Sequence, residues 1–149
     1  MRILRFCTVG ALLFLLLACG QTIGAADPQY EKTLQAAKKD GKPVMLYFWS
    51  QTCYYCKQME KNTLADKEIG TILDKDFYLL RINVEKSPDL AKLYQVKGYP
   101  SSWFLESSGK RIIEAPGYIQ KPLFKKILEY VKGNHYKNTD IHEYLKKKT

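Results

Sequence analysis

Residues 44–56 read VMLYFWSQTCYYC and decide the fold. The first six form a continuous apolar run after Pro43, too short for a separate helix and rich in residues that suit a sheet, so they predict a buried central strand. Cys53 and Cys56 follow at the expected start of a helix, whose buried face continues through Met59, Thr63 and Leu64. The stretch therefore predicts a strand that leads into a helix carrying two thiols in its first turn.

Strand and helix patterns alternate on both sides of this stretch. An opening helix is predicted from Asp27-Pro28 to Gly41, because the pair resembles an N-cap with proline at the first helical position. Downstream we expect a short helix over 67–73, a strand over 77–84, a helix from Ser87, a hairpin with strands near 103–105 and 112–113, and a helix from Pro122 to Gly133. The order α-β-α-β-α-β-β-α predicts an α/β fold with parallel pairing of the first two strands.

Composition limits the chain to one soluble domain with a short appendage. The 149 residues are 46% hydrophobic and 26% charged, which favours a packed core over disorder. The net charge of +9 is spread along the chain, so we expect no nucleic-acid binding. Residues 134–149 form a polar C-terminal extension, in which Ile141, Tyr144 and Leu145 would pack one amphipathic turn on the domain.

The N-terminus has the pattern of an export signal. Arg2 and Arg5 precede an uncharged, mostly apolar run over 6–18, shorter than the about 20 residues of a membrane-spanning helix. Leu16-Leu17-Ala18-Cys19 resembles a bacterial lipobox, which would make Cys19 a lipidated N-terminus after a signal peptide of residues 1–18 and place 19–27 as a linker. The alternative is ordinary cleavage after Ala26. Both predict a periplasmic location, with a membrane lipid anchor in the first case.

Cysteine usage points to redox chemistry. Cys7 falls in the signal and Cys19 is lipidated or removed, so only Cys53 and Cys56 remain in the domain. Two thiols separated by two residues close a disulfide that exchanges readily in an oxidising compartment. They would also be half of a metal site in a metallochaperone, but such a site needs further ligands, so we expect no metal and no cofactor. A binding lipoprotein with a structural disulfide is a third alternative.

A family resemblance rests on two separate motifs. The strand ending in Tyr47-Phe48-Trp49 and leading to Cys53-Tyr54-Tyr55-Cys56, together with Gly98-Tyr99-Pro100-Ser101 before the hairpin, resembles the thioredoxin superfamily over residues 28–133. The chain is similar to exported bacterial thioredoxin-like proteins, the SoxW type and the C-terminal domain of DsbD. The resemblance implies a three-layer, thioredoxin-like fold with a central mixed sheet flanked by helices.

The resemblance also assigns roles to residues. It implies that Cys53 is the nucleophile, that Cys56 resolves the mixed disulfide, and that Pro100 is a cis-proline that holds the substrate chain. Four aromatic residues are further candidates for contacts with the client: Trp49, Tyr54, Tyr55 and Tyr99.

The proton acceptor of the second step departs from the family pattern. Tyr47 stands six residues before Cys53, where cytoplasmic thioredoxins carry a buried aspartate. Glu60 lies one helical turn after Cys56, so we expect its carboxylate to accept the proton that Cys56 loses, as DsbD-like domains carry a glutamate at the same offset. The alternative is a surface carboxylate paired with Lys57 or Lys61.

These features together predict an exported thiol-disulfide oxidoreductase that reduces disulfides of client proteins. Tyr54 and Tyr55 add no charge beside the thiolate, and a carboxylate at Glu60 disfavours it, so both favour a reducing couple. A membrane thiol-reductant transporter of the DsbD or CcdA type is the expected electron donor. A disulfide oxidase or isomerase is the alternative.

Overall fold

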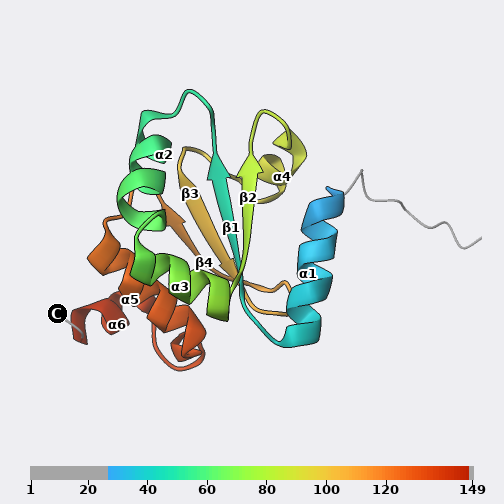
Figure 1. The fold of residues 1–149 in the computed structure, drawn as a ribbon. Helices are drawn as coiled ribbons and strands as arrows, with labels where there is room; N and C mark the ends of the chain where they lie inside the picture. Colours follow the sequence, from blue (N-terminus) through green and yellow to red (C-terminus); the bar gives the residue numbers. More distant parts are fainter. Residues whose placement is uncertain (1–26, 148–149) are drawn as a thin grey trace, which may run out of the picture.

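The computed structural model describes residues 27–147. The predicted signal peptide, Cys19 and all of the predicted linker except Asp27 lie outside these residues. The elements follow each other along the chain in the order α1 Pro28–Asp40, β1 Val44–Trp49, α2 Tyr54–Met59, a π-helical turn η1 Glu60–Leu64, α3 Lys67–Asp76, β2 Tyr78–Asn83, α4 Pro88–Leu93, β3 Ser101–Leu105, β4 Arg111–Pro116, α5 Lys121–Lys132, a 3₁₀ turn η2 His135–Lys137 and α6 Ile141–Lys147 (Figure 1).

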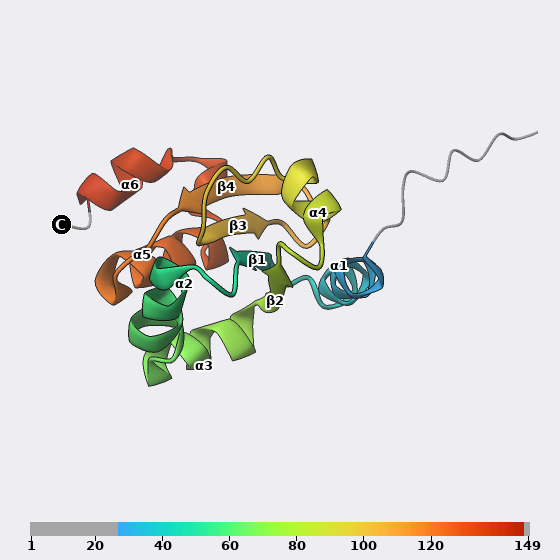
Figure 2. The same ribbon diagram turned by 90° about the horizontal axis from the view of Figure 1, so that it is seen from above.

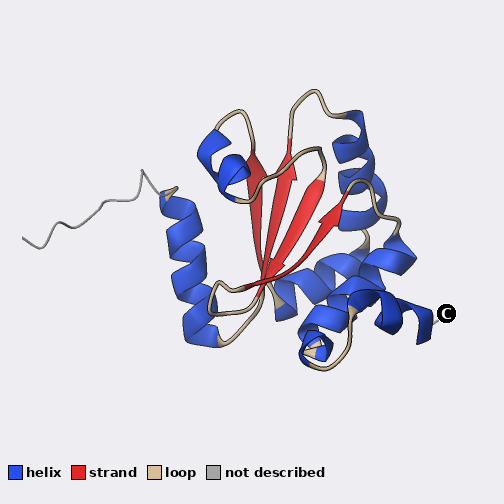
Figure 3. Ribbon diagram, turned by 180° about the vertical axis from the view of Figure 1, so that it is seen from behind, coloured by secondary structure: helices blue, strands red, loops and turns tan. Residues whose placement is uncertain are grey.

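The strands form one mixed sheet in the order β2-β1-β3-β4 (Figure 3). β1 pairs in parallel with β2 and antiparallel with β3, and β3 and β4 form an antiparallel hairpin. Helices α1 and α4 cover one face of the sheet, and α2, α3 and α5 cover the other (Figure 2). The three-layer fold, the mixed sheet and the parallel pairing of the first two strands are thereby confirmed.

Side chains of β1 alternate between two cores. Met45 and Tyr47 face α2, α3 and α5, whereas Leu46 and Phe48 face α1 and α4, and all four are fully buried. Burial on both faces explains why the strand is continuously apolar, as is usual where helices cover both sides of a sheet. Burial on both faces also fixes the orientation of β1, and with it the point at which the chain enters α2.

Local sequence signals set the ends of the opening helix. The Asp27 carboxylate accepts hydrogen bonds from the backbone N–H groups of Gln29 and Tyr30, at 3.0 and 3.3 Å. Gly41 ends the helix with a φ of 68°, a left-handed conformation that glycine adopts without steric cost. The predicted N-cap and stop residue of this helix are confirmed.

The helix after the cysteines departs from the expected regular pattern. The spacing of its buried residues predicts one uninterrupted helix, but Glu60–Leu64 forms a π-helical turn with a hydrogen bond from Ala65 N to Glu60 O of 2.9 Å. Thr63 of this turn is fully buried and donates its hydroxyl to the Ile119 carbonyl oxygen at 2.7 Å. The polar contact anchors the turn to the segment before α5.

The C-terminal extension packs on the domain as expected. Tyr144 of α6 is buried and its ring centroid lies 5.1 Å from that of Tyr130 in α5, while Ile141 and Leu145 pack against the same core. In residues 27–147, no helix combines the length and the apolar character needed to cross a membrane.

Candidate active site

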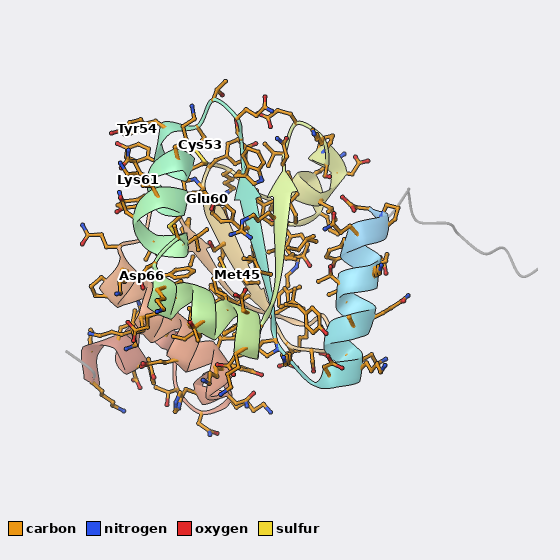
Figure 4. All side chains as sticks on the ribbon, in the orientation of Figure 1. Met45, Cys53, Tyr54, Glu60, Lys61 and Asp66 are labelled. Carbon is orange, nitrogen blue, oxygen red and sulfur yellow. A yellow bond between two sulfur atoms is a disulfide. The ribbon has the colours of Figure 1, made fainter. Side chains whose placement is uncertain are left out.

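Cys53 and Cys56 form a disulfide where the chain passes from β1 into α2 (Figure 4). Cys53 is the N-cap residue of α2, and its Sγ accepts a hydrogen bond from the backbone N–H of Cys56 at 3.0 Å. Cys56 is 2% exposed, whereas Cys53 is only partly buried. An attacking thiol from solvent therefore reaches the sulfur of Cys53 before that of Cys56.

A carboxylate from the turn after β2 fixes the loop that carries Cys53. Glu85 Oε1 accepts hydrogen bonds from the Ser50 hydroxyl at 2.6 Å and from Gln51 N at 3.3 Å, and Ser50 O accepts from Cys53 N at 3.3 Å. The Ser50 hydrogen bond is the main reason that the pKa of Glu85 lies below its usual value. Sequence reasoning missed Ser50 and Glu85, because nothing in their spacing indicates contact.

The Tyr99–Pro100 peptide bond is cis, and Pro100 is buried. Phe48 pairs with Ser101 in the register of β1 and β3, so Pro100 lies opposite the end of β1, next to Trp49. The Pro100 carbonyl oxygen accepts a hydrogen bond from Gly117 N at 2.7 Å. Between residues 27 and 147 the backbone N–H and C=O of Tyr99 have no hydrogen-bond partner, which leaves them free for an extended chain.

Exposed aromatic rings lie beside the disulfide. Tyr54 and Tyr55 are 66% and 60% exposed with ring centroids 5.5 Å apart, and Tyr99 is 41% exposed. Trp49 is partly buried and packs against the core on the α2 side of the sheet. Large apolar side chains in solvent at one place are typical of a surface that binds other proteins.

Tyr47 lies behind the disulfide, where it is fully buried. Its hydroxyl donates to the Cys56 carbonyl oxygen at 3.3 Å. Burial, with a smaller contribution from the Glu60 carboxylate, raises the pKa of Tyr47 far above its usual value, and nearby Arg81 opposes the shift. The phenol therefore stays protonated at neutral pH and does not act as the proton acceptor for Cys56.

Glu60 lies on the side of η1 that faces the strands, whereas Lys61 points outward (Figure 4). Its Oε1 accepts a hydrogen bond from Arg81 Nε of β2 at 3.3 Å, and both side chains are nearly half exposed. Among the described residues no ion pair joins Glu60 to Lys57 or Lys61, so that alternative for its partner is wrong. The partner of Glu60 lies instead on β2. Arg81 pairs in register with Tyr47 of β1, and its side chain reaches the Glu60 carboxylate.

An accessible disulfide at a helix N-terminus, beside a cis-proline loop and on a mixed sheet covered by helices, defines a thiol-disulfide oxidoreductase of the thioredoxin-like class. A family model described as a thioredoxin-like domain matches residues 30–132, and the chain belongs to this family.

Relatives and solved structures agree with this assignment. The thiol:disulfide interchange protein DsbD of Salmonella typhi is 38% identical over 78 residues, which are 50% of this chain and 14% of that protein. A thioredoxin from Thermus thermophilus superposes with a TM-score of 0.63 and 30% identity, covering 68% of this chain and 82% of that one. The reduced DsbD C-terminal domain of Neisseria meningitidis has a TM-score of 0.60 and 25% identity, covering 72% and 97%.

The curated relatives are much longer than this chain. The matched segments span between 8% and 17% of the length of those proteins. The similarity therefore concerns one domain of each relative.

Proposed function

We propose that this protein is an exported reductase of client disulfides, with Cys53 as nucleophile and Cys56 as resolving thiol. The observation that carries the direction is the surroundings of Cys53: within residues 27–147, the backbone N–H of Cys56 is the one polar group that hydrogen-bonds its sulfur. A strong oxidant stabilises its thiolate with additional donors or positive charge, and the adjacent Tyr54 and Tyr55 supply neither. Such a site favours the disulfide over the dithiol, so the reduced protein tends to pass its two electrons to a client disulfide.

The reaction balances as two exchanges. The Cys53 thiolate attacks one sulfur of the client disulfide, a mixed disulfide forms, and the other client sulfur leaves as a thiolate. Cys56 then loses its proton and attacks Cys53 Sγ, which releases the second client thiolate and leaves the Cys53–Cys56 disulfide present in the structure. Two electrons pass to the client, and a thiol-reductant transporter of the DsbD or CcdA type in the membrane restores the dithiol.

Glu60 is our candidate for the group that accepts the Cys56 proton. It follows the resolving cysteine by one turn, and its ion pair with Arg81 holds the carboxylate toward the strands. Tyr47, with its raised pKa, leaves this role to Glu60.

The client would lie across the cis-proline loop. The free backbone groups of Tyr99 would pair with an extended client segment, and Pro100 would set the direction of that segment beside the disulfide. Tyr54 and Tyr55 would contact the client from the α2 side, and the partly buried Trp49 at the end of β1 would contact it next to Pro100.

The N-terminal sequence supports a proposal for the location of the protein. Residues 1–18 have the pattern of a lipoprotein signal, and we infer that Cys19 carries the lipid that anchors the protein on the periplasmic side of a membrane. The similarity to DsbD supports a role in extracytoplasmic thiol exchange.

Equilibration of the protein with glutathione buffers tests the direction of electron flow. We expect a reduction potential nearer to about −270 mV, the thioredoxin value, than to about −120 mV, the DsbA value. The control is Cys56→Ser, which cannot close the internal disulfide and should instead accumulate glutathione on Cys53. A potential above about −170 mV would place the protein among oxidases or isomerases.

A further inference from the structure

A cavity of about 480 Å³ lies between the α4–β3 loop and the strands β3 and β4. We call it the loop pocket; its lining includes Lys97, Tyr99, Trp103, Arg111, Glu114 and Gly117. Trp103 belongs to the core on the side of the sheet covered by α1 and α4, so the pocket opens on the face opposite α2.

The loop pocket adjoins the cis-proline loop. Tyr99 precedes Pro100, and Gly117, which follows β4, donates its backbone N–H to the Pro100 carbonyl oxygen, so residues on both sides of Pro100 contribute to the pocket wall. A client segment that pairs with the Tyr99 backbone would therefore reach the pocket within a few residues of its reactive cysteine. The pocket therefore lies where it would contact client side chains close to that cysteine.

Aromatic rings fix a cation in the wall of the pocket. The Arg111 guanidinium carbon lies 4.5 Å from the centroid of the Tyr94 ring and 5.3 Å from that of Trp103. Arg111 Nη2 also donates to the Leu93 carbonyl oxygen at 2.7 Å. Stacking and hydrogen bonding hold the guanidinium in one orientation, which reduces the entropy lost when it binds an anion.

The pocket has more hydrogen-bond donors than acceptors. Neither Lys97 nor Arg111 forms an ion pair with a carboxylate within the part of the chain that the structure describes. The indole Nε1 of Trp103, a residue of the lining, is buried and has no hydrogen-bond partner among the described residues. Glu114 is the one carboxylate of the lining, and its Oε1 accepts the Ser101 hydroxyl at 2.9 Å. The lining thus has a surplus positive charge and unused donors.

We propose that the loop pocket binds an aspartate or glutamate side chain of the client, close in sequence to the client cysteine, and thereby selects acidic client segments. The proposal rests on the function proposed above, because it specifies the client of the same site. Lys97 and Arg111 would bind the carboxylate as charge-assisted donors, with the Tyr94 and Trp103 rings holding the Arg111 guanidinium in position.

Cyclic disulfide peptides in matched pairs test this proposal. Each pair differs by glutamate against glutamine at one position, and the pairs place that position one to five residues on either side of the attacked cysteine. The reduced protein is mixed with each peptide, and its oxidation is followed by the rate of formation of the Cys53–Cys56 disulfide. We expect at least one position where the glutamate peptide reacts about threefold to tenfold faster, with the advantage reduced at high salt.

Variants locate the effect in the loop pocket. Lys97→Gln should reduce the preference for glutamate, and Arg111→Gln should reduce it further. Lys97 is exposed and forms no ion pair within residues 27–147, so its replacement should not disturb folding. Lys110→Gln is the control, because Lys110 is a neighbouring exposed cation outside the lining and should keep the full preference.

The outcomes separate this proposal from the function on which it rests. Equal rates for the glutamate and glutamine peptides at every position would overturn the loop pocket as an acidic subsite and leave the reductase function intact. A preference that survives Lys97→Gln and Arg111→Gln would also overturn it. If the reduced protein reacts neither with the peptides nor with a small neutral disulfide, the proposed function fails as well.

Discussion

Tyrosine side chains lie behind the Cys53–Cys56 disulfide and in front of it, in opposite environments. Behind it, Tyr47 is fully buried and its hydroxyl is bonded to the Cys56 carbonyl oxygen. In front, Tyr54 and Tyr55 expose 66% and 60% of their surface. A buried tyrosine with a bonded hydroxyl contributes to the free energy of folding, whereas exposed tyrosines are available to another molecule. The rear of the site therefore holds Cys56 in place, and the front receives the client.

Truncation of the rear tyrosine should have the largest effect. Tyr47→Ala removes a fully buried ring and should lower the free energy of unfolding by about 3–5 kcal/mol, measured by denaturant titration. Tyr47→Phe is the matched control, since it keeps the ring and loses only the hydrogen bond, for about 1 kcal/mol. Equal losses in the two variants would assign the stabilisation to the hydroxyl and contradict a packing role.

The carboxylate at the rear should affect one step of the exchange. Glu60→Gln removes the proton acceptor, so the attack of Cys56 on the mixed disulfide should slow about tenfold, equivalent to about 1.4 kcal/mol, while attack by Cys53 keeps its rate. Rapid-mixing measurements of the two steps separate them. Lys61→Gln is the control, because Lys61 points away from the strands (Figure 4). Unchanged rates for both steps would reduce Glu60 to a surface charge.

The smallest effect should come from the front of the site. Replacing both Tyr54 and Tyr55 by alanine should change the free energy of unfolding by less than about 0.5 kcal/mol, because both rings are mostly in solvent. The KM for a protein client should rise about threefold at a similar kcat. Leu123→Ala, at an exposed apolar position of α5, controls for loss of surface hydrophobicity. A stability loss like that of Tyr47→Ala would remove the distinction between front and rear.

The sequence was sufficient for the features that depend on local pattern. The apolar run of β1, the start of α2 at Cys53 and the N-cap at Asp27 each arise from neighbouring residues, and the structure contains all three. The cis bond before Pro100 followed from a family motif and is present as well.

Contacts between distant elements were not predictable in the same way. Glu60 binds Arg81 across 21 residues, and Ser50 binds Glu85 across 35. Spacing rules identify partners close by on the same helix, such as Lys57 three residues before Glu60, and they do not reach Arg81 on another element. The loop pocket was not predictable for the same reason. Lys97, Trp103 and Arg111 come together only when the hairpin packs against the α4–β3 loop.

The packing of α6 shows that the unit shared with relatives and the unit that folds have different ends. The family match stops at residue 132, yet the aromatic core continues into Tyr144, which contacts the ring of Tyr130. The family match covers the residues of the redox site, whereas the hydrophobic core continues one helix further, into α6. A graft of the catalytic domain onto another protein would therefore need residues up to 147 to keep the outer surface of α5 covered.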